Sequence, residues 1–162
     1  MNKAGKAFEE LVKIMDELRE KCPWDREQTF ESIRSLTIEE TYELTDALLE
    51  KDYQNVKKEL GDLLLHIVFY SKIASESNLF NITDVIDQLS KKLIYRHPHI
   101  FGTEQVASAS EVLENWEQIK MTEKGGNKTV LSGVPKSLSA LIKANRIQEK
   151  VRAVGFDWEV RT

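Results

Sequence analysis

Four carboxylates in one acidic stretch of the chain are spaced for joint chemistry. Glu40 and Glu43 are three residues apart, and so are Glu59 and Asp62. On a helix, this spacing puts both members of a pair on one face. The two pairs also stand at mirror-image positions about a central turn. If two helices fold back antiparallel there, Glu40 faces Asp62 and Glu43 faces Glu59.

Such a hairpin would bring four negative charges into one small volume, which at pH 7 requires bound protons or cations. The turn is expected at Lys51 and Asp52. The acidity is local, because residues 37–62 contain eight acidic and three basic residues, whereas the whole chain has a formal net charge of −4. Since every candidate ligand is a carboxylate oxygen, the expected cation is hard: Mg²⁺, with Mn²⁺ as a substitute.

Three other interpretations of these acids are open. Thr37 and Glu40 have the spacing of a capping box, which would give Glu40 a structural role at a helix start, and acidic helix faces are commonly just solvated. Paired carboxylates also occur in di-iron bundles, but that class uses Glu-x-x-His where this chain has Glu59-x-x-Asp62. The mirror register of the two pairs, with Gly61 thinning the second helix beside them, favours a joint hard-metal site.

Helices must position these acids, and the composition favours helices. The 162 residues include only 7 glycines and 3 prolines, with 41% hydrophobic and 31% charged residues, which is typical of a globular all-α fold. Apolar residues at helical spacing and capping signals predict helices over residues 3–21, 38–50, 55–77, 83–96, 108–122 and 138–155.

Residues 124–137 concentrate three glycines and a proline, which predicts a flexible linker between a helical domain, 1–123, and a C-terminal helix and tail, 138–162. No signal peptide is visible, and the longest apolar run, 63–70, is too short to span a bilayer. Cys22 is the single cysteine, so a cytoplasmic protein is expected. A pI near 5.5 without a basic stripe argues against duplex nucleic acid as a partner.

Basic and aromatic residues suited to a nucleotide occur outside the acidic stretch. Lys92 and Arg96 are four residues apart, a spacing able to grip adjacent phosphates. Trp116 and Lys120 repeat this spacing, so an indole beside an ammonium would hold a base next to a phosphate. Trp24 would close over the same ligand or plug the end of the bundle. The ordinary alternatives are solvated cations and tryptophans packed in the core.

At these motifs the chain resembles the MazG family of nucleoside triphosphate pyrophosphohydrolases. The family pattern, E-x-x-E followed by a spacer and E-x-x-D, is met by Glu40, Glu43, Glu59 and Asp62. Other agreeing segments are CPWDREQTF, RHPHIF, EVLENWEQIK and VGFDW. The resemblance implies an all-α bundle of the MazG type that is completed by dimerisation. It also implies Mg²⁺-dependent hydrolysis of nucleoside triphosphates to monophosphate and pyrophosphate, as house-cleaning of the nucleotide pool.

The resemblance further implies that the four acids hold the metal and that Lys92 and Arg96 bind the nucleotide. Tyr95 stands where some relatives have a second arginine. Glu39, next to the acids, is a candidate to orient or deprotonate the attacking water. Longer relatives contain two such domains, and this chain resembles the first repeat, with VGFDW at residues 154–158 where the second begins. A catalytically inactive dimeric module with a vestigial or regulatory metal site is the alternative.

Overall fold

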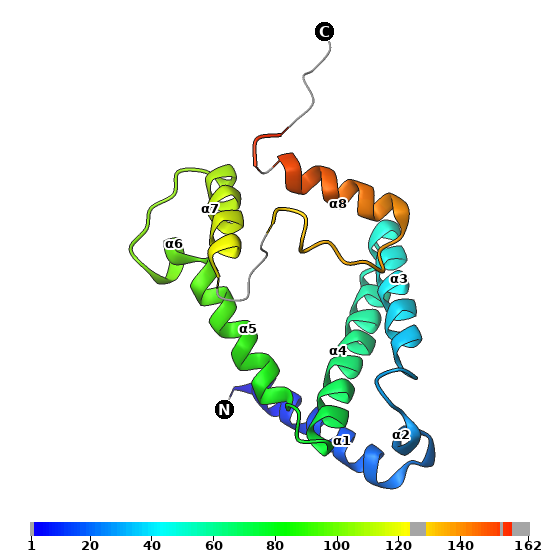
Figure 1. The fold of residues 1–162 in the computed structure, drawn as a ribbon. Helices are drawn as coiled ribbons and strands as arrows, with labels where there is room; N and C mark the ends of the chain where they lie inside the picture. Colours follow the sequence, from blue (N-terminus) through cyan, green and yellow to red (C-terminus); the bar gives the residue numbers. More distant parts are fainter. Residues whose placement is uncertain (1, 124–128, 153, 157–162) are drawn as a thin grey trace. The chain divides into compact units, whose positions relative to one another are not determined.

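The computed structural model describes residues 2–123, 129–152 and 154–156, and in these ranges the chain forms helices joined by turns and loops, without a strand (Figure 1). The predicted all-α fold is therefore confirmed. Residues 1–88 and residues 89–162 form two compact units. The helices are α1 Lys3–Lys21, α2 Pro23–Glu27, α3 Arg34–Glu50, α4 Tyr53–Glu76, α5 Ile82–Arg96, α6 Pro98–Phe101, α7 Ala109–Thr122 and α8 Ala140–Arg152.

Helices α3 and α4 lie side by side in the first unit and form the expected hairpin (Figure 1). Lys51 closes α3 in the left-handed conformation, with φ at 57°, a common way to end a helix. Asp52 then caps α4, because its side chain accepts hydrogen bonds from the backbone N–H groups of Gln54 and Asn55. The turn predicted at Lys51 and Asp52 is confirmed.

The alternative interpretation of Thr37 and Glu40 as a capping box is wrong, because α3 begins earlier, at Arg34. Thr37 lies inside the helix, where its hydroxyl donates to the Ile33 carbonyl at 3.0 Å and is 2.9 Å from the Tyr70 hydroxyl of α4. This is the back-bonding expected of a threonine within a helix. Ile33, which directly precedes α3, is fully buried, and we attribute the earlier start of the helix to the packing of Ile33 in the core. Glu40 therefore lies inside α3 and has no capping role.

The core of the first unit is built mainly from α1 and α4. Met15, Ile33, Val68, Phe69 and Ile73 form one buried cluster. The apolar side of α4 extends beyond this cluster, and part of it faces solvent in the single chain: Leu60 is 53% exposed, Leu64 38% and Ile67 48%.

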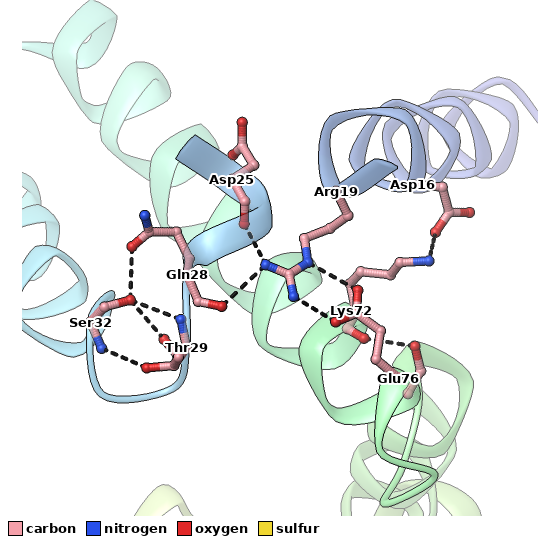
Figure 2. Close-up of polar contacts among 9 residues, drawn as sticks. Asp16, Arg19, Asp25, Gln28, Thr29, Ser32, Lys72 and Glu76 are labelled. Carbon is pink, nitrogen blue, oxygen red and sulfur yellow. Dashed lines mark hydrogen bonds and ion pairs between the residues drawn. The ribbon is translucent and has the colours of Figure 1, made fainter. Parts of the chain in front are cut away.

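Arg19 joins three elements of the first unit (Figure 2). Its Nε and Nη2 atoms donate to the two carboxylate oxygens of Glu76 on α4, at 2.9 and 2.5 Å. Its Nη1 atom donates to the carbonyls of Asp25 and Gln28, at the end of α2. The guanidinium also lies 5.7 Å from the centre of the Phe69 ring. One side chain thus fixes α1 and α2 to the C-terminal part of α4.

Polar side chains cap the starts of two later helices. The Asn81 side chain accepts hydrogen bonds from the N–H groups of Thr83 and Asp84 at the start of α5. The Ser108 hydroxyl accepts from the Glu111 N–H at the start of α7.

The boundaries predicted at 1–123, 124–137 and 138–162 remain predictions, and residues 124–128 of that linker, like residues 157 and 158 of VGFDW, lie outside the described part. None of the described helices has the length and hydrophobicity that crossing a bilayer requires.

The Arg19–Glu76 pair predicts a defined pH dependence of stability. Hydrogen bonds from Arg19 are the main reason that the pKa of Glu76 lies below its ordinary value of 4.5. The unfolded chain therefore binds a proton at Glu76 more readily than the folded chain. The stabilisation is complete above the unfolded pKa and is lost as pH falls through the lower, folded pKa.

We therefore expect Glu76→Gln to lower the free energy of unfolding by about 1 kcal/mol at pH 7, and this difference from wild type should shrink as pH falls below about 4.5. Urea denaturation at several pH values measures it. Glu17→Gln, which alters an exposed i,i+4 pair with Lys21, is the matched control and should stay close to wild type. Equal losses in the two variants, or a loss at Glu76 that does not depend on pH, would contradict this assignment.

Candidate functional site

Three acids of the α3–α4 hairpin converge on one point. Glu40 and Glu43 come from α3 and Glu59 comes from α4, and one carboxylate oxygen of each lies within 4.8 Å of the others. The i,i+3 spacing puts the first two on one face of α3, and the tight turn brings α4 against that face. The predicted convergence across the hairpin is therefore present for these three side chains, which together are called the acid cluster below.

Glu59 is the buried member of the acid cluster, with 4% of its surface exposed. Its Oε1 atom accepts a hydrogen bond from the Lys58 ammonium at 2.8 Å. Its Oε2 atom is buried and has no hydrogen-bond partner among the described residues. Leaving a buried carboxylate oxygen unpaired is costly, so this atom is suited to a cation ligand.

Asp62, the fourth predicted ligand, is linked to the acid cluster through Lys58. The Lys58 Nζ atom lies 3.5 Å from Asp62 Oδ2 and 3.9 Å from Glu43 Oε2. One ammonium thus neighbours acids from both helices of the hairpin. Asp62 lies one turn after Glu59 on α4, on the same side of the helix.

The charges around Glu40 are unbalanced. Burial raises the pKa of Glu40 above its ordinary value, and the negative charges of Glu43, Asp62 and Glu59 raise it further. The pKa of Lys58 is also raised, chiefly because Glu59 accepts its hydrogen bond. The contributions of the three neighbouring carboxylates at Glu40 indicate that Lys58 does not fully neutralise the acids around it.

Three other residues of the first unit have side chains capable of a functional role, and they lie outside the acid cluster. Glu39 is exposed on α3 beside it, and its role toward water stays a prediction. Trp24 lies on α2 with 54% of its surface exposed, so its role toward substrate also stays a prediction. His66 is buried on α4, and burial lowers its pKa, which agrees with a packed histidine rather than a charged one.

The predicted nucleotide-binding residues of the second unit have protein neighbours. The Nε and Nη2 atoms of Arg96 donate to the two carboxylate oxygens of Glu123, at 3.0 and 2.6 Å. The pKa of Glu123 is lowered mainly by these hydrogen bonds, with smaller contributions from the positive charges of Arg96, Lys92 and Lys120. A phosphate bound through the Nε and Nη2 atoms of Arg96 would have to replace this carboxylate.

The expected pairing of Trp116 with Lys120 is present. The Lys120 ammonium lies 4.4 Å from the centre of the Trp116 ring. The centre of the His97 ring lies 6.1 Å from the centre of the Trp116 ring, and the indole Nε1 of Trp116 is buried without a hydrogen-bond partner among the described residues. Whether this pair holds a base stays a prediction.

Sequence reasoning missed two residues of these sites, Lys58 and Glu123. Lys58 directly precedes Glu59 and lies four residues before Asp62, so helical spacing alone would have indicated an ion pair. Glu123 lies 27 residues after Arg96, and no local spacing rule connects residues so far apart.

Comparison with known proteins connects these residues with a known domain. Residues 28–101 match the model of the MazG nucleotide pyrophosphohydrolase domain, a range that contains all four predicted metal ligands. The chain also resembles the crystal structure of a MazG-related protein from Thermotoga maritima, with a TM-score of 0.60 and 25% sequence identity over 69% of this chain and 97% of that one.

Among curated relatives, the nucleoside triphosphate pyrophosphohydrolase of Escherichia coli K12 is 44% identical over 93% of this chain. The pyrophosphohydrolase/pyrophosphatase MazG of Thermotoga maritima is 49% identical over 98% of this chain. The chain spans only 59% and 62% of the length of these two relatives. The family-model match spans the positions of both acidic pairs, and we conclude that the chain contains a MazG nucleotide pyrophosphohydrolase domain at residues 28–101, which confirms the resemblance that its motifs indicated.

Proposed function

We propose that this chain hydrolyses nucleoside triphosphates to nucleoside monophosphate and pyrophosphate at the acid cluster of the α3–α4 hairpin, in a reaction that depends on Mg²⁺. The observation that carries the proposal is the approach of Glu40, Glu43 and Glu59 to within 4.8 Å of one another. The names of relatives at 44% and 49% identity support the substrate class. Removal of unwanted nucleotides from the cellular pool is the role proposed for this reaction.

The residues fit a hard divalent cation. All candidate ligands are carboxylate oxygens, which Mg²⁺ and Mn²⁺ prefer, and the buried Oε2 of Glu59 has no other partner among the described residues. Glu40, Glu43, Glu59 and Asp62 would hold the ion. When bound, the cation supplies positive charge to the phosphate oxygens and activates water for attack.

The chain's own residues would position the reactants. Glu59 is held by burial, so it would give the cation a ligand of fixed position. Exposed Glu39 is proposed to orient the attacking water or accept its proton, because it lies on α3 next to Glu40. Phosphoanhydride hydrolysis needs little covalent work from a protein, so positioning and charge neutralisation are sufficient tasks for this set.

Lys92 and Arg96 are proposed to bind the phosphates, and Trp116 and Trp24 the base. Arg96 already makes a two-point contact with a carboxylate, and a phosphate presents similar paired oxygens. Exchange of Glu123 for phosphate would therefore keep the guanidinium geometry. Stacking tolerates different bases, so the tryptophans would permit several nucleotides.

A homodimer is proposed on the apolar side of α4. Leu60, Leu64 and Ile67 are each more than a third exposed, and such a row on a central helix is suited to burial against a second copy.

The one cysteine, Cys22, is free, which supports a reducing cytoplasm as the location. A catalytically inactive dimeric module with a regulatory metal is the alternative function.

Release of pyrophosphate from a panel of nucleoside triphosphates tests the proposal. Wild type should release it with Mg²⁺ and not with excess chelator. Glu43→Gln should reduce turnover by at least about 100-fold, because it removes a metal ligand, while its melting temperature in chelator should be unchanged or raised, since a crowded charge is lost. Asp46→Asn, an exposed change one turn further along α3, is the matched control.

Failure of wild type to release pyrophosphate from any nucleotide of the panel would favour the inactive module. Equal turnover in Glu43→Gln and Asp46→Asn would exclude the acid cluster as the site of reaction.

Metal and nucleotide should stabilise the protein in a fixed order, with the metal bound first. Mg²⁺ should raise the melting temperature by mass action, and a non-hydrolysable triphosphate should raise it further only when metal is present, because the acid cluster repels free phosphates. Replacing Lys92 and Arg96 with alanine should reduce the nucleotide increment and spare the metal increment. Glu123→Gln, which removes the carboxylate paired with Arg96, should strengthen the nucleotide increment.

Thermal melting with each ligand alone and with both measures these increments. Two results would contradict the assignment of metal to the acid cluster and of nucleotide to Lys92 and Arg96. One is nucleotide binding in excess chelator, and the other is an unchanged nucleotide increment in the double alanine variant.

Sedimentation at micromolar concentration should give about twice the chain mass of 18.7 kDa, since the exposed apolar row of α4 needs a partner. Leu64→Glu places a charge in that row and should shift the equilibrium toward monomer. Sedimentation of wild type at 18.7 kDa would count against the dimer.

A further inference from the structure

Lys58 occupies a position typical of a bound cation. Its ammonium lies 2.8 Å from Glu59 Oε1, 3.5 Å from Asp62 Oδ2 and 3.9 Å from Glu43 Oε2. These three carboxylates come from both helices of the hairpin, and they are three of the four acids assigned above to the divalent cation. The ammonium and the metal would therefore draw on the same oxygens.

The two sides of this contact differ in their freedom to move. The Lys58 side chain is 59% exposed, whereas the Glu59 side chain is 6% exposed. A lysine has a long flexible stem and a strongly hydrated ammonium, so Lys58 can return to water at little cost. Glu59 cannot follow it, because its carboxylate is held in the interior. The lysine is thus the exchangeable partner.

We propose that Lys58 is the internal counter-cation of the acid cluster in the metal-free protein and that divalent metal binds by displacing it. This inference rests on the proposed metal site. Lys58 supplies one positive charge and leaves Glu59 Oε2 unpaired, whereas a divalent ion supplies two charges and takes several oxygens. Since the two cations repel each other and share ligands, Lys58 stabilises the metal-free hairpin and lowers the affinity for metal, as linkage requires.

The neighbouring residue provides a matched control. Lys57 lies on the same helix and its ammonium donates to Gln54 Oε1 at 3.1 Å, away from the acid cluster. Lys57→Met and Lys58→Met therefore change the net charge of the chain equally. They differ in whether the lost charge contacts the acids.

Two measurements on the full chain test the proposal: thermal melting in excess chelator and calorimetric titration with Mg²⁺ alone. Lys58→Met should melt below Lys57→Met in chelator and should bind Mg²⁺ about fivefold more tightly, because a nearby positive charge is removed. The melting difference should disappear at saturating Mg²⁺. Lys58→Arg, which keeps the charge, should stay near wild type in both measurements.

Equal Mg²⁺ affinities of Lys58→Met and Lys57→Met, with wild type binding normally, would overturn the role of Lys58 and leave the proposed function standing. Equal melting temperatures of the two variants in chelator would overturn it as well. Failure of wild type to bind Mg²⁺ in the same titration would overturn both this inference and the metal site on which it rests.

Discussion

Mutual repulsion of carboxylates held together by a short hairpin is the constraint on which the rest of this structure depends. The turn at Lys51 and Asp52 leaves α3 and α4 no freedom to separate their acidic faces. The raised pKa of Glu40 and the unpaired oxygen of Glu59 record this crowding. Such an arrangement is suited to binding positive charge. The carboxylates already lie close together, so they need little reorganisation when a cation or a cation-bound substrate arrives.

Stabilising contacts elsewhere in the first unit offset the repulsion between the acids. The buried cluster around Met15, Val68 and Phe69 packs α1 against α4, and Arg19 ties both to the end of α2 through Glu76 and two backbone carbonyls (Figure 2). These contacts lie toward the opposite end of α4 from Glu59, at distances along the helix from about two and a half turns at Val68 to nearly five turns at Glu76. Stabilising contacts and the acidic site therefore occupy different parts of one helix, and the site tolerates unfavourable charge because the packing elsewhere holds the helix in place.

Much of this arrangement could be predicted from the sequence because it is local. Spacing of three between Glu40 and Glu43 and the turn residues at Lys51 and Asp52 fix the hairpin and the convergence of acids without distant information. The start of α3 could not be predicted, since it depends on burial of Ile33 in a tertiary core rather than on the capping pattern at Thr37. The partner of Arg96 was also beyond reach, because Glu123 is brought to it by the fold of the second unit. Lys58 was within reach of spacing rules, but a lysine among acids is ordinarily only a solvated neighbour.

Crystals of the protein grown with Mn²⁺ would test the central claim most directly, through anomalous scattering from the ion. The account predicts an anomalous peak bounded by carboxylate oxygens of Glu40, Glu43, Glu59 and Asp62, with the Lys58 ammonium turned away from Glu59. Anomalous density at other residues only, or an acid cluster that keeps Lys58 and binds no ion at saturating Mn²⁺, would contradict it.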